Sequence, residues 1–221
     1  MVGCISIFCT RDQRHAYRER LLCGVAFLQK PTSLLDVRCS ILPGMTYDEL
    51  KSLCKTRRSI RYFDQKPVDK EDVLSLLELA RLAPSVENLQ PWHFHVIYNK
   101  ELRIKLMESC CYGNFVEGAG VFILVSVNTT LENAAKEPIW NPKELEYSCM
   151  AAMEHILLGA TAMGLGSTWV SLHHGSAHEI LDLPRHEIIV GGIMLGHYKK
   201  GEENPSNGQR RPLEEMYTFH E

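Results

Sequence analysis

The 221-residue sequence lacks the signatures of several common enzyme classes. It has no Gly-x-Ser-x-Gly nucleophile turn, no phosphate-binding loop ending in Gly-Lys-Ser/Thr, and no paired-carboxylate pattern. Its eight cysteines form no Cys-x-x-Cys pair and no spacing typical of zinc or iron–sulfur sites. The side chains therefore indicate little covalent chemistry of their own, which is typical of enzymes whose cofactor carries the reaction.

A strong net charge and long apolar runs are also absent. The net charge of -3 gives no reason to expect nucleic acid or an anionic membrane as a partner. No apolar run approaches the roughly 18–20 residues that a membrane-spanning helix needs. The sequence shows no convincing signal peptide, so we expect mostly reduced thiols and a cytoplasmic location.

Residues 1–44 differ from the remainder because no helical or strand period is sustained in them. Their basic residues follow the first apolar run, which is the reverse of the order in a signal peptide. Asp12 and Glu19 interrupt the basic stretch, which weakens the case for a transit peptide. We expect residues 1–44 to be an extension, either a misassigned start or a poorly ordered arm. Residues 45–221 should then form one globular domain.

Helix start and stop signals are clear after this point. The stretch 46–49, Thr-Tyr-Asp-Glu, is a capping box, and Asp69 can cap a second helix that ends before Pro84. A short helix is expected over 101–110. A long helix should begin after Asn141 and run to about Met163, with Gly164 as its C-terminal stop.

Three segments read as strands because they are rich in β-branched, aromatic or continuous apolar residues: 93–98, 121–127 and 188–195. The paired Gly191 and Gly192 in the last of these suggest that a backbone or a ligand approaches closely there.

Two groups of histidines need an interpretation. His93 and His95 share one face of the first strand, and we interpret them as strand residues, with a metal or proton role as the alternative. His173, His174 and His178 lie close together in the sequence without an acidic metal-ligand pattern, so a surface or helix-cap role is favoured.

Residues 56–63, Thr-Arg-Arg-Ser-Ile-Arg-Tyr-Phe, place three guanidinium groups and a serine hydroxyl within five positions. Guanidinium groups match phosphate oxygens bidentately. In an extended backbone Arg57, Ser59 and Arg61 would point the same way and could follow a long ligand. The alternative is a solvated basic surface strand.

This stretch is followed by 83–92, Ala-Pro-Ser-Val-Glu-Asn-Leu-Gln-Pro-Trp, and near the end by 210–215, Arg-Arg-Pro-Leu-Glu-Glu. In this order, the three segments resemble the FMN-dependent nitroreductase family, and the resemblance runs from about Met45 to the end. It implies an α+β fold: a three-layer α/β/α sandwich around a mainly antiparallel sheet. It also implies a homodimer with FMN at the subunit interface.

The resemblance further implies roles for individual residues. Arg57 and one of Arg210 and Arg211 would hold the FMN phosphate, Arg58 would support it or face solvent, and Ser59 would contact the ribityl chain. Arg61 would sit near N1 and the C2 carbonyl of the ring, and a backbone N–H near Val170 and Ser171 would address N5. Asn114 would reach the ligand from its loop, and Pro84, Ser85 and Asn88 would reach the flavin from the partner subunit. No side chain is expected to be catalytic in its own right, because the flavin carries the hydride.

The activity implied is that of an NAD(P)H-dependent flavin oxidoreductase. NADH or NADPH would reduce FMN and leave, and a nitroaromatic, a quinone or a similar small electrophile would then take the electrons in a ping-pong cycle. Three alternatives stay open. One is a reductive dehalogenase-like or flavin-processing branch of the superfamily, for which Glu144 and Tyr147 could form a lid pair but no matching lysine is found. Another is a flavin- or nucleotide-binding regulatory module without turnover. The third is a metal-binding protein that uses the histidines and cysteines.

Overall fold

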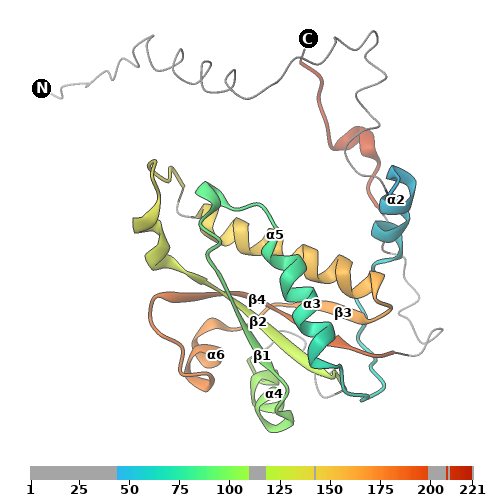
Figure 1. Ribbon diagram of the computed structural model, residues 1–221, viewed down its shortest axis with the longest axis vertical. Coiled ribbons are helices and arrows are strands. Elements are labelled where there is room, and N and C mark those ends of the chain that lie inside the picture. Colours follow the sequence, from blue (N-terminus) through green and yellow to red (C-terminus); the bar gives the residue numbers. More distant parts are fainter. Residues whose placement is uncertain (1–43, 110–117, 142, 199–207, 209, 221) are drawn as a thin grey trace, which may run out of the picture. The chain divides into compact units, whose positions relative to one another are not determined.

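The computed structural model describes residues 44–109, 118–141, 143–198, 208 and 210–220 (Figure 1). The chain divides into two compact units, Met1–Met45 and Thr46–Glu221, and every element described below belongs to the second. The expectations for residues 1–43 and for Asn114 lie outside the described residues.

The described helices begin and end close to where the sequence signals predict. The α-helices are α2 (Tyr47–Thr56), α3 (Lys70–Arg81), α4 (Lys100–Met107), α5 (Lys143–Ala162) and α6 (His174–Ile180). Short 3-10 turns are η2 (Val86–Asn88), η4 (Thr129–Ala134) and η5 (Leu213–Glu215). None of the helices in the described part of the chain is long and apolar enough to span a membrane.

Local hydrogen bonds explain most of these boundaries. At the start of α2, Thr46 and Glu49 make both bonds of a capping box. Asp69 occupies the N-cap position of α3, but the prediction that its side chain caps the helix is wrong, because it makes no cap hydrogen bond. Gly164 ends α5 with φ of +74°, and its N–H donates to Thr161 O at 3.1 Å.

The sheet has four strands: β1 (Trp92–Ile97), β2 (Val121–Asn128), β3 (Gly166–Val170) and β4 (Glu187–Gly196). Their order is β1-β2-β4-β3, and every pairing is antiparallel. β2 and β4 form the centre, which explains their near-continuous apolar sequences, because a strand with neighbours on both sides and helices on both faces meets no water. The short β3 was not predicted as a strand.

Helices cover both faces of the sheet (Figure 1). Alternate residues of β2 point to opposite faces: Ile123 and Val125 join a core with α3 and α5, whereas Phe122 and Leu124 join a core with α4 and α6. This arrangement confirms the predicted α+β fold with two helical layers around a mainly antiparallel sheet.

The paired glycines of β4 make room for side chains. A Cβ at Gly192 would lie 2.3 Å from the ring of Phe122, and one at Gly191 would lie 2.9 Å from Trp169 Nε1. The close approach expected there therefore comes from aromatic rings within the sheet layers.

Candidate functional site

The basic stretch leaves α2 as an extended segment alongside β3. Ser59 forms a parallel bridge with Ser167, and Ile60 N donates to Ser167 O at 2.9 Å. Ile60 is buried against Gly166, where a Cβ would come within 2.9 Å of the isoleucine side chain. A buried residue in the middle of the stretch fixes its orientation, so the cationic side chains on either side of it are held on a rigid support.

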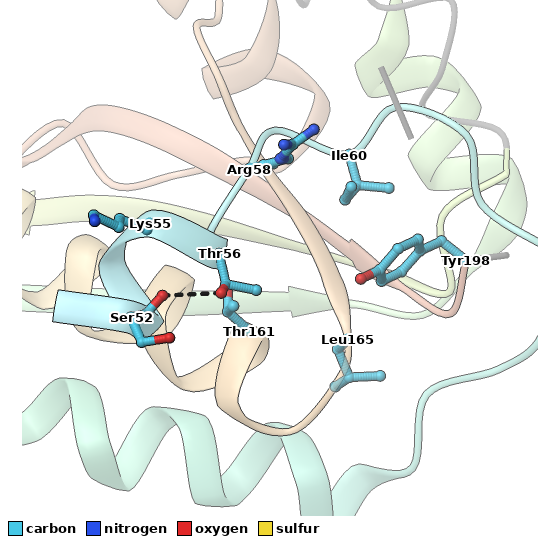
Figure 2. Close-up of a pocket in the computed structure, with 8 residues that line it drawn as sticks. All are labelled: Ser52, Lys55, Thr56, Arg58, Ile60, Thr161, Leu165 and Tyr198. Atoms are coloured by element: carbon cyan, nitrogen blue, oxygen red, sulfur yellow. Dashed lines mark hydrogen bonds between the residues drawn. The ribbon is translucent and has the colours of Figure 1, made fainter. Parts of the chain in front are cut away.

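Beside this segment lies a pocket of about 300 Å³ (Figure 2). It is bounded by α2, the end of α5 and the residues that follow β4. Eight residues line it: Ser52, Lys55, Thr56, Arg58, Ile60, Thr161, Leu165 and Tyr198. Arg58 and Ile60 share the pocket, as alternate residues of an extended backbone should, which places Arg57, Ser59 and Arg61 toward the other side of the segment.

The positively charged side chains of this region favour the binding of an anion. Arg57 and Arg58 are each half-buried, and neither guanidinium has a hydrogen-bond or ion-pair partner among the residues that the structure describes. Lys55 adds a third positive charge at the pocket. Half-buried cations without a carboxylate partner are costly, and a bound phosphate would offset that cost with charge-assisted hydrogen bonds.

The polar loop 84–90 is tightly folded and lies away from the pocket beside the basic stretch. Ser85 Oγ accepts a hydrogen bond from Gln90 N at 3.0 Å, and Asn88 and Gln90 have positive φ angles of 55° and 49°. Val86 N donates to Ser148 Oγ at 3.1 Å, which attaches the loop to the first half of α5. Pro84 and Asn88 are exposed, so this loop presents its polar groups outward.

The two groups of candidate residues therefore lie at opposite ends of α5. The loop is bonded to Ser148, whereas the pocket beside the basic stretch is lined by Thr161. At 1.5 Å per residue these two positions are about 20 Å apart along the helix axis.

Comparison with known proteins decides the family. The sequence model of the Nitroreductase family matches residues 54–113 and 108–197. This chain belongs to the nitroreductase family. The match begins just before the basic stretch and ends just after β4. It therefore includes the basic stretch and the polar loop 84–90, but not Arg210 and Arg211.

Individual relatives agree with the nitroreductase assignment. A protein of Archaeoglobus fulgidus, provisionally named NADH dehydrogenase/NAD(P)H nitroreductase, is 32% identical over 71% of this chain and 89% of its own length. The 5,6-dimethylbenzimidazole synthase of Rhodospirillum rubrum is 28% identical over 72% of this chain and 85% of its own. A provisionally named nitroreductase of Desulfovibrio desulfuricans, solved in complex with FMN, superposes with a TM-score of 0.65 and 29% identity, covering 80% and 99% of the two chains.

The remaining candidate residues lie in two further places. Val170 is buried as the last residue of β3, and Ser171 is exposed just after it, so both lie at the end of the strand whose Ser167 bridges to the basic stretch. Arg210 and Arg211 are exposed, and their described contacts are local: Arg210 Nη1 donates to Gly208 O at 3.3 Å, and Arg211 Nε to Glu215 at 3.2 Å.

Sequence reasoning missed several pocket residues, among them Lys55, Thr161 and Tyr198. These three come from α2, α5 and the segment after β4, and only the folded chain brings them together. No local pattern marks them, because an exposed helical lysine and a threonine near a helix end are ordinary in sequence.

Proposed function

We propose that this protein is an FMN-dependent oxidoreductase that uses NADH or NADPH to reduce small electrophiles such as nitroaromatics and quinones. Membership of the nitroreductase family supports this proposal, as does the likeness to a solved structure that contains FMN. The single observation that carries it is the pair of half-buried arginines, Arg57 and Arg58, which have no partner among the described residues and lie on the segment fixed to β3.

The residues present fit the cofactor. Arg57, supported by Arg58, would bind the FMN phosphate, and the hydroxyl of Ser59 would hydrogen-bond the ribityl chain next to it. Arg61, two residues further along the extended segment, would stand near N1 and the C2 carbonyl of the ring. One of Arg210 and Arg211 would complete the phosphate site.

We further propose that the flavin site is shared between two protomers. Because the loop 84–90 and the basic stretch lie at opposite ends of α5, a two-fold related partner running antiparallel along this helix would set its own loop beside the first protomer's arginines. Pro84, Ser85 and Asn88 would then reach the flavin from the partner subunit, where the outward-facing loop presents them.

The surface of the chain supports a homodimer. α2 buries none of its residues. Tyr147 and Met150 of α5 are exposed, and so is Met163 just after it, although other residues of this helix form the core. The C-terminal segment exposes four more large apolar side chains: Leu213, Met216, Tyr217 and Phe219. Exposed apolar groups over several elements are typical of a surface that another copy covers.

FMN, when bound, supplies the hydride chemistry, accepting from NAD(P)H and passing electrons to the acceptor. The chain's own contribution is position and charge. Arg61 would stabilise negative charge on the N1 and C2 side of the ring, which favours the reduced form. A backbone N–H near Val170 and Ser171 would donate toward N5.

The experiment is an absorbance spectrum of the purified full-length protein followed by anaerobic addition of NADH or NADPH. We expect a flavin spectrum that bleaches with one of the donors and recovers when a quinone or nitroaromatic is added. A yellow protein that neither donor bleaches would indicate a flavin-binding module without turnover, and a protein that binds no FMN would contradict the proposal.

One observation favours a second candidate, the flavin-processing branch, because the chain resembles a 5,6-dimethylbenzimidazole synthase over most of both lengths. The distinction is made by mass spectrometry of the products after aerobic incubation with reduced FMN. Formation of 5,6-dimethylbenzimidazole would establish this second function, and its absence together with turnover of an added acceptor would exclude it.

A further inference from the structure

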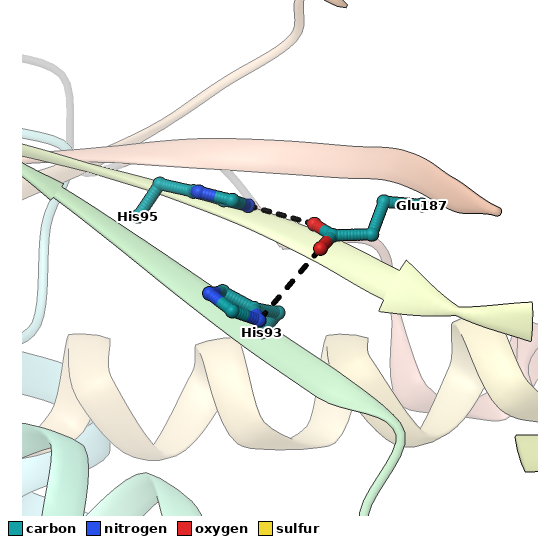
Figure 3. Close-up of side chains that lie close together, drawn as sticks. All are labelled: His93, His95 and Glu187. Atoms are coloured by element: carbon teal, nitrogen blue, oxygen red, sulfur yellow. Dashed lines mark hydrogen bonds and ion pairs between the residues drawn. The ribbon is translucent and has the colours of Figure 1, made fainter. Parts of the chain in front are cut away.

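Three ionisable side chains converge on the face of the sheet that α4 and α6 cover (Figure 3). His93 and His95 come from β1, and Glu187 is the first residue of β4 and reaches them across β2. The potential ligand atoms of these three residues all lie within 4.8 Å of one another.

The distances within the cluster suit a small cation. His95 Nε2 lies 2.9 Å from Glu187 Oε2, and His93 Nδ1 lies 3.8 Å from Glu187 Oε1. In a tetrahedral site with bonds of 2.0–2.1 Å, two ligand atoms are about 3.3 Å apart. The two observed separations lie on either side of this value, so small side-chain rotations would bring the atoms onto one ion.

Hydrogen bonding alone does not account for the placement of His93. At 3.8 Å from the carboxylate, His93 Nδ1 is too far for a hydrogen bond. Its ring nevertheless stacks on that of His95, with centroids 4.5 Å apart and 21° between the planes. Figure 3 shows both rings approaching the carboxylate of Glu187 with a nitrogen.

The cluster is buried at Glu187 and open to solvent at His93. The side chain of Glu187 is 8% exposed and that of His93 is 57% exposed, so an ion could enter past His93 and reach a buried carboxylate. Ser126 is buried and donates its hydroxyl to Glu187 Oε2 at 2.5 Å, and His178 Nε2 lies 3.0 Å from Glu187 O. Outer hydrogen bonds of this kind orient the ligating groups of metal sites.

We propose that His93, His95 and Glu187 bind one divalent transition-metal ion of the zinc class, with water in the remaining position. Two imidazoles and one carboxylate form a donor set that zinc and neighbouring first-row metals accept. The ion would attach the edge strand β1 to the central strand β4. This cluster is separate from the basic stretch, since β1 and β3 are opposite edges of the sheet.

The test is calorimetric titration of the full-length, flavin-loaded, chelator-treated protein with ZnCl₂, and a parallel titration with CoCl₂ followed by visible absorption. We expect one Zn²⁺ per protomer. His93→Ala should weaken binding about 100-fold, at least as much as loss of an outer partner costs. Glu187→Gln, which keeps the shape of the side chain, should weaken it similarly, and His186→Ala is the matched control and should bind like the unaltered protein.

Three results would overturn the proposal: no stoichiometric zinc binding, equal affinity in His93→Ala and the unaltered protein, or a cobalt spectrum with the near-ultraviolet band of thiolate ligands. If Glu187→Gln fails to fold, His93→Ala still decides, because its ring is largely exposed. Flavin content and reduction by NAD(P)H are recorded for every variant. Failure of zinc binding with intact flavin reduction would leave the proposed function standing.

Discussion

Ser59 and Ser167 form a parallel bridge that fixes the basic stretch to the edge of the sheet. The adjoining Ile60 N to Ser167 O hydrogen bond of 2.9 Å and the burial of Ile60 hold the segment in register. The bridge places Arg57 and Arg61 on a rigid backbone, so changes at these positions should alter ligand binding and electrostatics far more than folding.

Arg57→Ala should weaken FMN binding by about 1.5–3 kcal/mol, the loss of a charge-assisted contact, or roughly 10- to 150-fold in Kd. Fluorescence titration of the apoprotein with FMN measures this change. Arg185→Ala is the matched control, because it removes an exposed arginine far from the basic stretch in sequence. Equal FMN affinity in the Arg57 variant and the control would remove Arg57 from the phosphate site.

Arg61→Ala should lower the midpoint potential of the bound flavin more than it weakens flavin binding. The reason is that a fixed cation near N1 stabilises the reduced ring more than the oxidised ring. Reduction in equilibrium with a reference dye gives the potential, and Arg61→Lys should recover part of the shift because it keeps the charge. An unchanged potential in the alanine variant would contradict this role.

Gly192→Ala should destabilise the fold, because the new Cβ would lie 2.3 Å from the ring of Phe122 in the centre of the sheet. Overpacking of this kind costs about 1–3 kcal/mol. Gly118→Ala is the control, since a Cβ there would meet its nearest atom at an ordinary 3.4 Å. Urea denaturation of the two variants should show a lower midpoint for Gly192→Ala only, and equal midpoints would contradict the close packing.

Cys149 should resist alkylation in the native protein. Burial is the main cause that raises the pKa of this thiol to about 12, with a smaller contribution from Glu146, so almost no thiolate is present at neutral pH. Cys54 is exposed and should react first. Peptide mapping after brief iodoacetamide treatment distinguishes the two. Alkylation of Cys149 at the rate of Cys54 would contradict its burial, and unfolding before treatment should make the two sites equivalent.

The sequence predicted the elements that local chemistry decides. Thr46 and Glu49 marked the start of α2 because both halves of a capping box are read directly from residue types, and Gly164 marked the end of α5 for a similar reason. It did not reveal β3, whose five residues become a strand only through pairing with β4. A short segment stabilised by a distant partner carries little local signal.

For the candidate sites too, the sequence predicted what depends on local residue types and missed what depends on the fold. The arginines of the basic stretch and the polar loop were found because residue types cluster in sequence, and their placement at opposite ends of α5 became visible only in the fold. His93 and His95 were noticed as neighbours on one strand face, but Glu187, which completes the cluster, is two strands away in the sheet. Convergence across strands depends on topology and register, which residue types alone do not determine.

Each flavin should be held by two protomers, and a mixed-dimer experiment tests this sharing. Arg57→Ala and Asn88→Ala are unfolded, mixed in equal amounts and refolded, and activity is measured at an FMN concentration that fills the unaltered site but leaves each variant homodimer nearly empty. If the site is shared across a two-fold interface, half of the dimers would be mixed and each would contain one intact site, restoring about a quarter of the unaltered activity. If Arg57 and Asn88 act on the same flavin from one chain, every site would contain one defect and the mixture would regain no activity.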